Sequence, residues 1–166
     1  MIVSSQKNQK GYGLIEILVS MLVLAIGLLG VAGLQTQSIR FNHEAYLRTQ
    51  ATILAHDMVD RMRANRTLAI SGSYEFALGD TPTASVTLCE DAACSPGNIV
   101  QYDFSQWRAN IAASLPNGRG AVTPAGSTGT TWEEFVIDIS YDSISVDTES
   151  EDGSPTTIAF QYRTRI

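Results

Sequence analysis

The chain has 166 residues, 44% of them hydrophobic, and a formal net charge of −6, which suits one modest domain plus a helix. This acidic balance excludes direct nucleic-acid binding as the main role, because nucleic-acid-binding proteins use Lys and Arg to neutralise phosphates. Both lysines, Lys7 and Lys10, lie in the first eleven residues, so the rest of the chain carries nine arginines against seventeen acids.

A long apolar run follows this basic start. Residues 12–34 contain one charged side chain, Glu16. As a helix with a rise of about 1.5 Å per residue, the run spans about 35 Å, enough to cross a hydrocarbon core of about 30 Å. Two lysines before the run, against Arg40 soon after it, favour a cytoplasmic start and put the rest of the chain outside. A carboxylate is costly in lipid, so the position of Glu16 within the apolar run needs an explanation.

The start of the run resembles type IV prepilins and pseudopilins. The resemblance rests on the short basic leader, Gly11, the aromatic Tyr12 and the acid Glu16 at the fifth position after the glycine. It implies that a prepilin peptidase removes residues 1–11 and methylates the new N-terminus at Tyr12. We expect Glu16 to pair with that amine on a neighbouring subunit during assembly, because a paired buried charge is tolerated where an isolated one is not. The alternative is an uncleaved signal anchor.

The helix is predicted to continue as one rod to about residue 65. Residues 35–66 contain neither Pro nor Gly. Apolar residues recur at helical spacing along one face: Leu47, Ala51, Leu54, Met58 and Met62. We expect this stripe to pack on a globular head. Three glycines in the apolar run either let helices approach closely or are ordinary for membrane helices: Gly27, Gly30 and Gly33.

Later stretches resemble a narrower family, the type IV pilus modification protein PilV, a minor pilin. The stretches that carry the resemblance are residues 26–35, 55–65, 102–107 and 115–120, and a pair of cysteines also fits. The expected fold is α+β and type IV pilin-like. It comprises a leader (1–11), a transmembrane helix (12–34), its amphipathic continuation (35–66) and a periplasmic head with a small antiparallel sheet (67–166).

Within the head, Gly, Ser, Thr, Asp and Pro separate short apolar stretches. A helix is predicted for residues 104–115 and a loop for 126–131. Strands or extended segments are predicted for residues 74–78, 84–88 and 120–123. Two alternating runs, 135–142 and 157–166, flank an acidic Asp-Gly turn and predict an antiparallel hairpin whose apolar face covers the helical stripe.

Cys89 and Cys94 are predicted to form a disulfide, because an even cysteine count at close spacing favours one outside the inner membrane. A metal site is the alternative, but two thiols do not complete a tetrahedral zinc site, and His43 and His56 lie far away on the predicted helix. His56 forms an ordinary i, i+4 surface pair with Asp60. The acidic patches lack the spacing of a calcium loop, and no catalytic motif is present. We therefore expect no enzyme, cofactor or metal.

The resemblance implies a minor pilin that enters or primes a type IV pilus, with roles in pilus biogenesis and hence twitching motility, adhesion or DNA uptake. The implied partners are the prepilin peptidase, other minor pilins, the major pilin and the inner-membrane assembly apparatus. The implied location is the inner membrane, single-pass, with the C-terminal head in the periplasm, and the pilus after assembly. Two alternatives are a minor pseudopilin of type II secretion and a signal-anchored periplasmic binding module.

Overall fold

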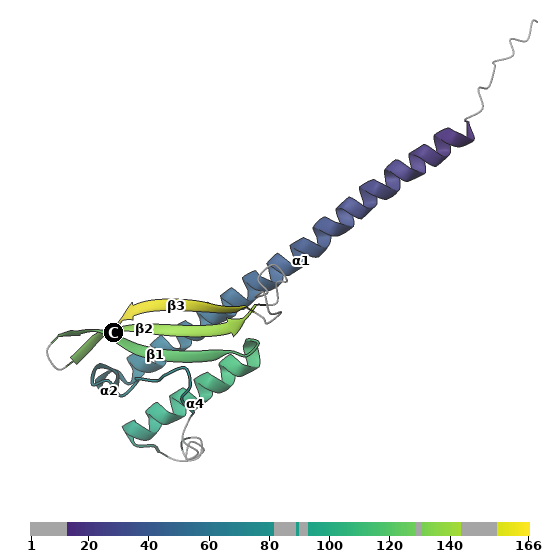
Figure 1. The fold of residues 1–166 in the computed structure, drawn as a ribbon. Coiled ribbons are helices and arrows are strands. Elements are labelled where there is room, and N and C mark those ends of the chain that lie inside the picture. The colour runs from purple at the N-terminus through teal and green to yellow at the C-terminus, as the bar shows by residue number, and fades with distance from the viewer. Residues whose placement is uncertain (1–12, 82–88, 90–92, 129–130, 144–155) are drawn as a thin grey trace, which may run out of the picture. The chain divides into compact units, whose positions relative to one another are not determined.

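The computed structural model describes residues 13–81, 89, 93–128, 131–143 and 156–166. Residues 1–41 and 42–166 form two compact units. Within these described residues, six elements follow one another (Figure 1). They are α1 (Leu14–Ala64), α2 (Arg66–Ile70), α4 (Pro96–Ser114), β1 (Arg119–Thr128), β2 (Thr131–Asp142) and β3 (Thr157–Arg165).

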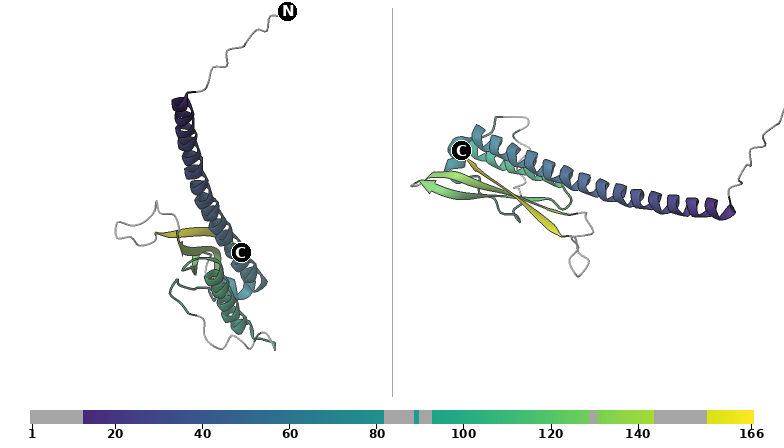
Figure 2. Two further views of the ribbon diagram at one scale, coloured as in Figure 1. Left: turned by 90° about the vertical axis from the view of Figure 1, so that its right-hand side faces the viewer. Right: turned by 90° about the horizontal axis from the view of Figure 1, so that it is seen from above.

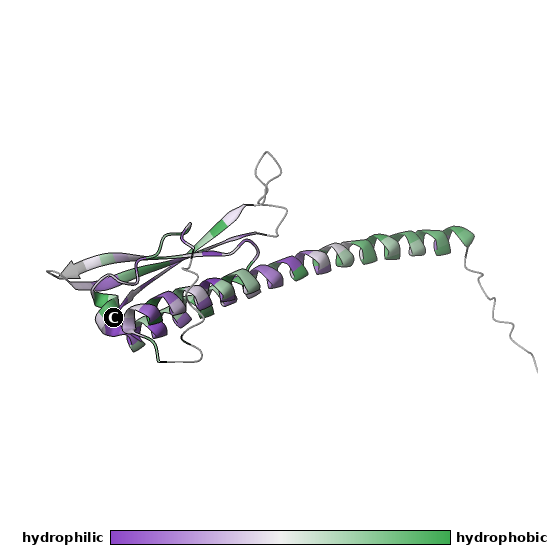
Figure 3. Cartoon of the chain, turned by 90° about the horizontal axis from the view of Figure 1, so that it is seen from below, coloured by the Kyte–Doolittle hydropathy of each residue, from purple (hydrophilic) through white to green (hydrophobic). Residues whose placement is uncertain are grey.

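Helix α1 confirms the prediction of one long helix with an apolar half and an amphipathic half. In Figure 3 the ribbon of α1 is mostly coloured as hydrophobic near its N-terminal end and is of mixed colour toward its C-terminal end. The predicted stripe is buried, together with Ala55 and Val59. Arg61 and Arg63 in the last turn favour the helix end, where the dipole is negative. The predicted start at Tyr12 lies outside the described residues.

Three antiparallel strands form a sheet in the order β1-β2-β3. The predicted hairpin of β2 and β3 is confirmed, with Phe135 opposite Thr164 and Asp142 opposite Thr157. Side chains of β2 alternate between the core and the outer face. The inward ones are fully buried: Phe135, Ile137, Ile139 and Tyr141.

The prediction of a loop at residues 126–131 is wrong for the residues that the structure describes. Residues 126–128 and Thr131 belong to strands, because β1 continues to Thr128 and β2 begins at Thr131. The pairing register between β1 and β2 shifts on both sides of Gly126. This glycine therefore lies at an irregularity within β1 and not in a turn. For residues 74–78, where the sequence predicts a strand or an extended segment, the structure has a single bridge between Phe76 and Val122 and no longer strand. The predicted segment 84–88 lies outside the described residues.

Helix α4 begins at Pro96 rather than Phe104. Ser95 caps the helix by accepting a hydrogen bond from Asn98 N at 3.3 Å, and Pro96 at the first helical position starts it, since proline is tolerated there. Helix α4 and the part of α1 after residue 42 cover one face of the sheet (Figure 2). Trp107 of α4 lies in this core and donates from Nε1 to the carbonyl oxygen of Leu54 at 2.8 Å.

Candidate assembly surface and the polar cluster of the head

The apolar half of α1 exposes its side chains on all sides. Every residue from Leu14 to Leu34 is exposed, including the large apolar ones. Among the described residues, α1 is the one helix long and apolar enough to cross a membrane. A helix that is apolar all round is stable only when lipid or other apolar surfaces surround it. This half of α1 is therefore the candidate surface for membrane insertion and for packing with similar helices.

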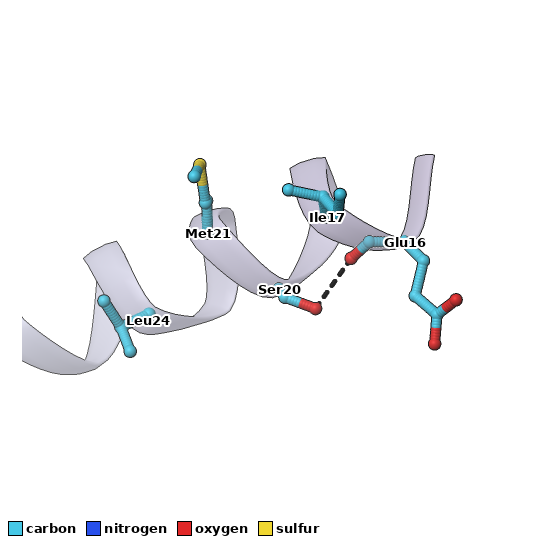
Figure 4. A pocket seen from close by; sticks show the side chains of 5 residues that line it. All are labelled: Glu16, Ile17, Ser20, Met21 and Leu24. Carbon is cyan, nitrogen blue, oxygen red and sulfur yellow. Dashed lines mark hydrogen bonds between the residues drawn. The ribbon is translucent and has the colours of Figure 1, made fainter. Parts of the chain in front are cut away.

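Glu16 lies in the first turn of α1, and its carboxylate points outward from the helix (Figure 4). Ser20 Oγ donates to the backbone oxygen of Glu16 at 2.6 Å, so it does not neutralise the carboxylate. Within the described part of the chain no hydrogen bond or ion pair reaches that carboxylate. Glu16 and Ser20 line an open hollow with Ile17, Met21 and Leu24. A charge in such apolar surroundings needs a cationic partner.

The predicted functional residues belong to separate parts of the chain. Gly11 and Tyr12 lie outside the described residues. Cys89 and Cys94 are joined by a disulfide with their Cα atoms 5.2 Å apart. The bridge belongs to the unit of residues 42–166, whereas Glu16 belongs to the other unit. The cysteine bridge directly precedes the cap of α4, so its position indicates a structural role at the start of that helix.

The head contains a polar cluster that the sequence analysis did not predict, formed by Asp57, Arg61, Tyr74 and Asp103. Arg61 Nε donates to Asp57 Oδ2 at 3.0 Å, and its Nη1 donates to Asp103 Oδ1 at 3.1 Å. The hydroxyl of Tyr74 donates to Asp103 Oδ2 at 2.6 Å. Tyr74 is fully buried and Asp103 is 8% exposed. The cluster therefore connects α1, α4 and the segment after α2 through charge-assisted hydrogen bonds, which are the strong ones.

The electrostatics of this cluster are those of a structural network. Burial raises the pKa of the Tyr74 hydroxyl, and its hydrogen bond to the Asp103 carboxylate raises it further. Burial alone would lower the pKa of Arg61, but the hydrogen bonds and charges of Asp57 and Asp103 outweigh it and raise that pKa. No group of three or more His, Cys, Asp or Glu side chains in the described residues could hold a metal ion.

The sequence offered little signal for this cluster. Arg61 and Asp103 are 42 positions apart, and Tyr74 and Asp103 are 29 apart. The three arginines at residues 61, 63 and 66 are explained equally well by the helix dipole. The one hint is that Arg61 flanks the buried face of α1, where a charged side chain needs a partner.

Two family models match parts of the chain. Residues 6–32 match the family model described as the prokaryotic N-terminal methylation motif, and residues 33–105 match the one described as Tt1218-like, type IV pilin Tt1218. The chain is type IV pilin-like. Type IV pilins are structural subunits, so the prediction that the protein is not an enzyme is confirmed. Searches of curated proteins and of solved structures found no match.

The methylation motif and the apolar helix together indicate how this pilin-like protein is processed and anchored. The motif contains Gly11, Tyr12 and Glu16, and it implies processing by a prepilin peptidase and assembly with other pilins. The exposed apolar half of α1 indicates a membrane anchor. The protein therefore has a pilin role in a type IV pilus or a related system.

Proposed function

We propose that the protein is a minor pilin of the PilV type, cleaved after Gly11 and methylated at Tyr12, that enters or primes a type IV pilus. The observation that carries the proposal is the methylation motif of residues 6–32, which leads into a helix with apolar side chains exposed on all sides. The resemblance of residues 55–65 to PilV and the paired cysteines support the narrower assignment.

In this proposal the apolar half of α1 stores the subunit in the inner membrane and then packs among other pilin helices. Apolar surface leaves lipid and is buried in the filament, so polar pairs such as Glu16 with the Tyr12 amine of a neighbour set the register. The head lies in the periplasm, where the Cys89–Cys94 disulfide is stable. The partners are the prepilin peptidase, other minor pilins, the major pilin and the inner-membrane assembly apparatus.

Mass spectrometry of the N-terminus tests the proposal, on protein recovered from membranes and from sheared pili, with and without the prepilin peptidase. We expect a methylated Tyr12 start that depends on the peptidase and is found in the pili. An intact Met1, or a cut near Leu34, would contradict the proposal and favour an anchored periplasmic module. A methylated protein found with a type II secretion pseudopilus and absent from pili would favour a pseudopilin.

The pairing of Glu16 has its own test. Glu16→Ala should still be cleaved and inserted in the membrane but should enter pili less efficiently, because the Tyr12 amine of the neighbour loses its counter-charge. Ser20→Ala is the matched control, since that hydroxyl bonds the Glu16 backbone oxygen and not the carboxylate. Equal amounts of wild type and Glu16→Ala in sheared pili would refute the pairing.

A further inference from the structure

We propose that the outer edge of strand β3, with which no described strand pairs, is an assembly contact that pairs with an extended segment of a neighbouring pilin subunit. This inference rests on the proposed function, because a filament supplies that neighbour at close range. All the observations behind it come from residues 42–166, which form one compact unit.

The two edges of the sheet differ in their protection. The edge at β1 is occupied at one point, where Phe76 N donates to Val122 O at 3.0 Å and Val122 N donates to Phe76 O at 2.8 Å. Further along, Pro124 has no N–H to donate, and the register shifts around Gly126 make the strand irregular. Covering segments, proline and bulges are the devices by which proteins stop an edge from pairing with another chain.

Among the described residues, no strand covers the edge at β3, and the strand itself has neither a bulge nor a proline. Residues 157–162 read Thr-Ile-Ala-Phe-Gln-Tyr, with no charge, proline or glycine. The pairing of β3 with β2 is continuous from Thr157 to Arg165, and no strand in the described part of the chain pairs with the outer side of β3. A regular, uncharged edge of this kind is a ready template for another strand.

The backbone groups that face this edge follow from the register. Ser143 N donates to Thr156 O at 2.8 Å, and Ile166 N donates to Glu133 O at 3.1 Å. Hydrogen-bonded pairs alternate in an antiparallel ladder, so the even-numbered residues of β3 bond to β2. The odd-numbered residues direct their N–H and C=O groups to the free edge, and their side chains are exposed: Thr157, Ala159, Gln161, Arg163 and Arg165.

An apolar row beside this edge is incompletely covered. Ile158, Phe160 and Tyr162 pack against the core yet are only partly buried. The ring centre of Tyr162 lies 4.7 Å from that of His56, an exposed residue of α1. An added strand would place alternate side chains beside this row and complete its burial. The occupant is therefore an extended segment with apolar residues at alternate positions.

The charge on β3 predicts a further property of the segment that pairs with it. The two charged residues of β3 are Arg163 and Arg165, both exposed. Arg165 forms an ion pair with Glu134 at 3.1 Å, whereas Arg163 has no ion pair among the described residues. Opposite charges facing one another across strands are stabilising and like charges are not. The neighbouring segment therefore carries an acidic residue opposite Arg163.

Substitution of Gln161 tests this edge. Gln161→Pro removes an N–H that faces the edge and leaves the N–H groups that bond to β2 in place. Gln161→Ala is the matched control, because it loses the same side chain and keeps the N–H. We expect the Gln161→Pro protein in sheared pili to fall by about tenfold relative to wild type, and the Gln161→Ala protein to stay near it.

A second variant guards against a folding defect. Ala159→Lys keeps the strand backbone and adds a charge of the kind that blocks edge pairing, so it should also lower incorporation. Thermal unfolding of each full-length protein in detergent shows which variants are folded. If all folded edge variants enter pili as wild type does, the edge contact is refuted. If wild type is neither methylated nor found in pili, the proposed function fails before the edge is tested.

Discussion

The two halves of α1 share a helical backbone and differ in what surrounds them. From Leu14 to Leu34 every residue is exposed, whereas the stripe from Leu47 to Met62 is buried in the head. Two methionines show the contrast, since Met21 is 64% exposed and Met58 is fully buried. An apolar stripe of helical period thus indicates a partner within the chain, and an apolar surface on all sides indicates a partner outside it.

Of the predictions that follow, substitution of Met58 has the largest expected effect on the free energy of unfolding, and Met21 serves as its control. Met58→Ala leaves a cavity in the core and should lower the free energy of unfolding of the head by about 2 to 5 kcal/mol. Met21→Ala changes an exposed side chain and should change it by less than about 0.5 kcal/mol. Chemical denaturation of the full-length protein in detergent, followed by near-UV circular dichroism, measures both. If Met58→Ala and Met21→Ala lowered the free energy of unfolding equally, the two halves of α1 would not differ in packing as the structure indicates.

Two arginines at the end of α1 allow the stability cost of losing a partly buried charge to be compared with that of losing an exposed one. Arg61→Ala removes the cation between Asp57 and Asp103 and leaves the nearly buried Asp103 carboxylate without its counter-charge, so it should cost about 3 kcal/mol. Arg63→Ala removes an exposed partner of Asp60 and should cost less than about 0.5 kcal/mol. The difference in denaturation midpoint between the two variants is the measurement. A cost for Arg63→Ala as large as that for Arg61→Ala would contradict it.

The same cluster predicts a loss of stability in alkali. The pKa of Tyr74 is raised above its ordinary value of 10.0 by burial and by Asp103, so above that pH the unfolded chain releases a proton that the native head keeps. Stability therefore falls as the pH rises above 10.0, by up to about 1.4 kcal/mol per pH unit. Tyr74→Phe should cost about 1.5 kcal/mol near neutrality and should flatten this alkaline slope.

Melting temperatures measured across alkaline pH check the role of Tyr74. Tyr46→Phe is the control, because Tyr46 is an exposed tyrosine of α1. It should leave both the neutral stability and the alkaline slope as in wild type. The prediction is refuted if Tyr74→Phe has the wild-type slope above the ordinary tyrosine pKa of about 10.

Substitutions of two glycines should change the stability of the head with opposite signs, and that of Gly97 should have the smaller effect. A Cβ at Gly120 would meet the ring of Trp107, so Gly120→Ala should cost about 1 to 3 kcal/mol. A Cβ at Gly97 would meet nothing within 4 Å, so Gly97→Ala should stabilise the head by about 0.5 kcal/mol through reduced entropy of the unfolded chain. Thermal unfolding resolves both changes. A destabilising Gly97→Ala would indicate a contact at the start of α4 that the structure lacks.

Local patterns predicted the elements that depend on neighbours in sequence. The helical spacing of Leu47, Ala51 and Leu54, four and then three residues apart, predicted the buried face of α1, and the alternation from Phe135 to Tyr141 predicted the inward face of β2. Local turn residues misled in two places. Pro96 was not recognised as a helix start, and Gly126 was read as part of a loop although it lies inside β1.

By itself the sequence determined the apolar helix, the methylation motif, the two alternating strands of the hairpin and the cysteine pair, because each pattern can be read within one continuous stretch of the chain. Only the tertiary structure decided the contact of Arg61 with Asp103, the bridge of Phe76 to β1 and the open edge of β3. These features join segments distant in the chain, and the positions of such segments follow from the packing of the whole core. No local propensity specifies which polar groups that packing brings together or which edge it leaves open.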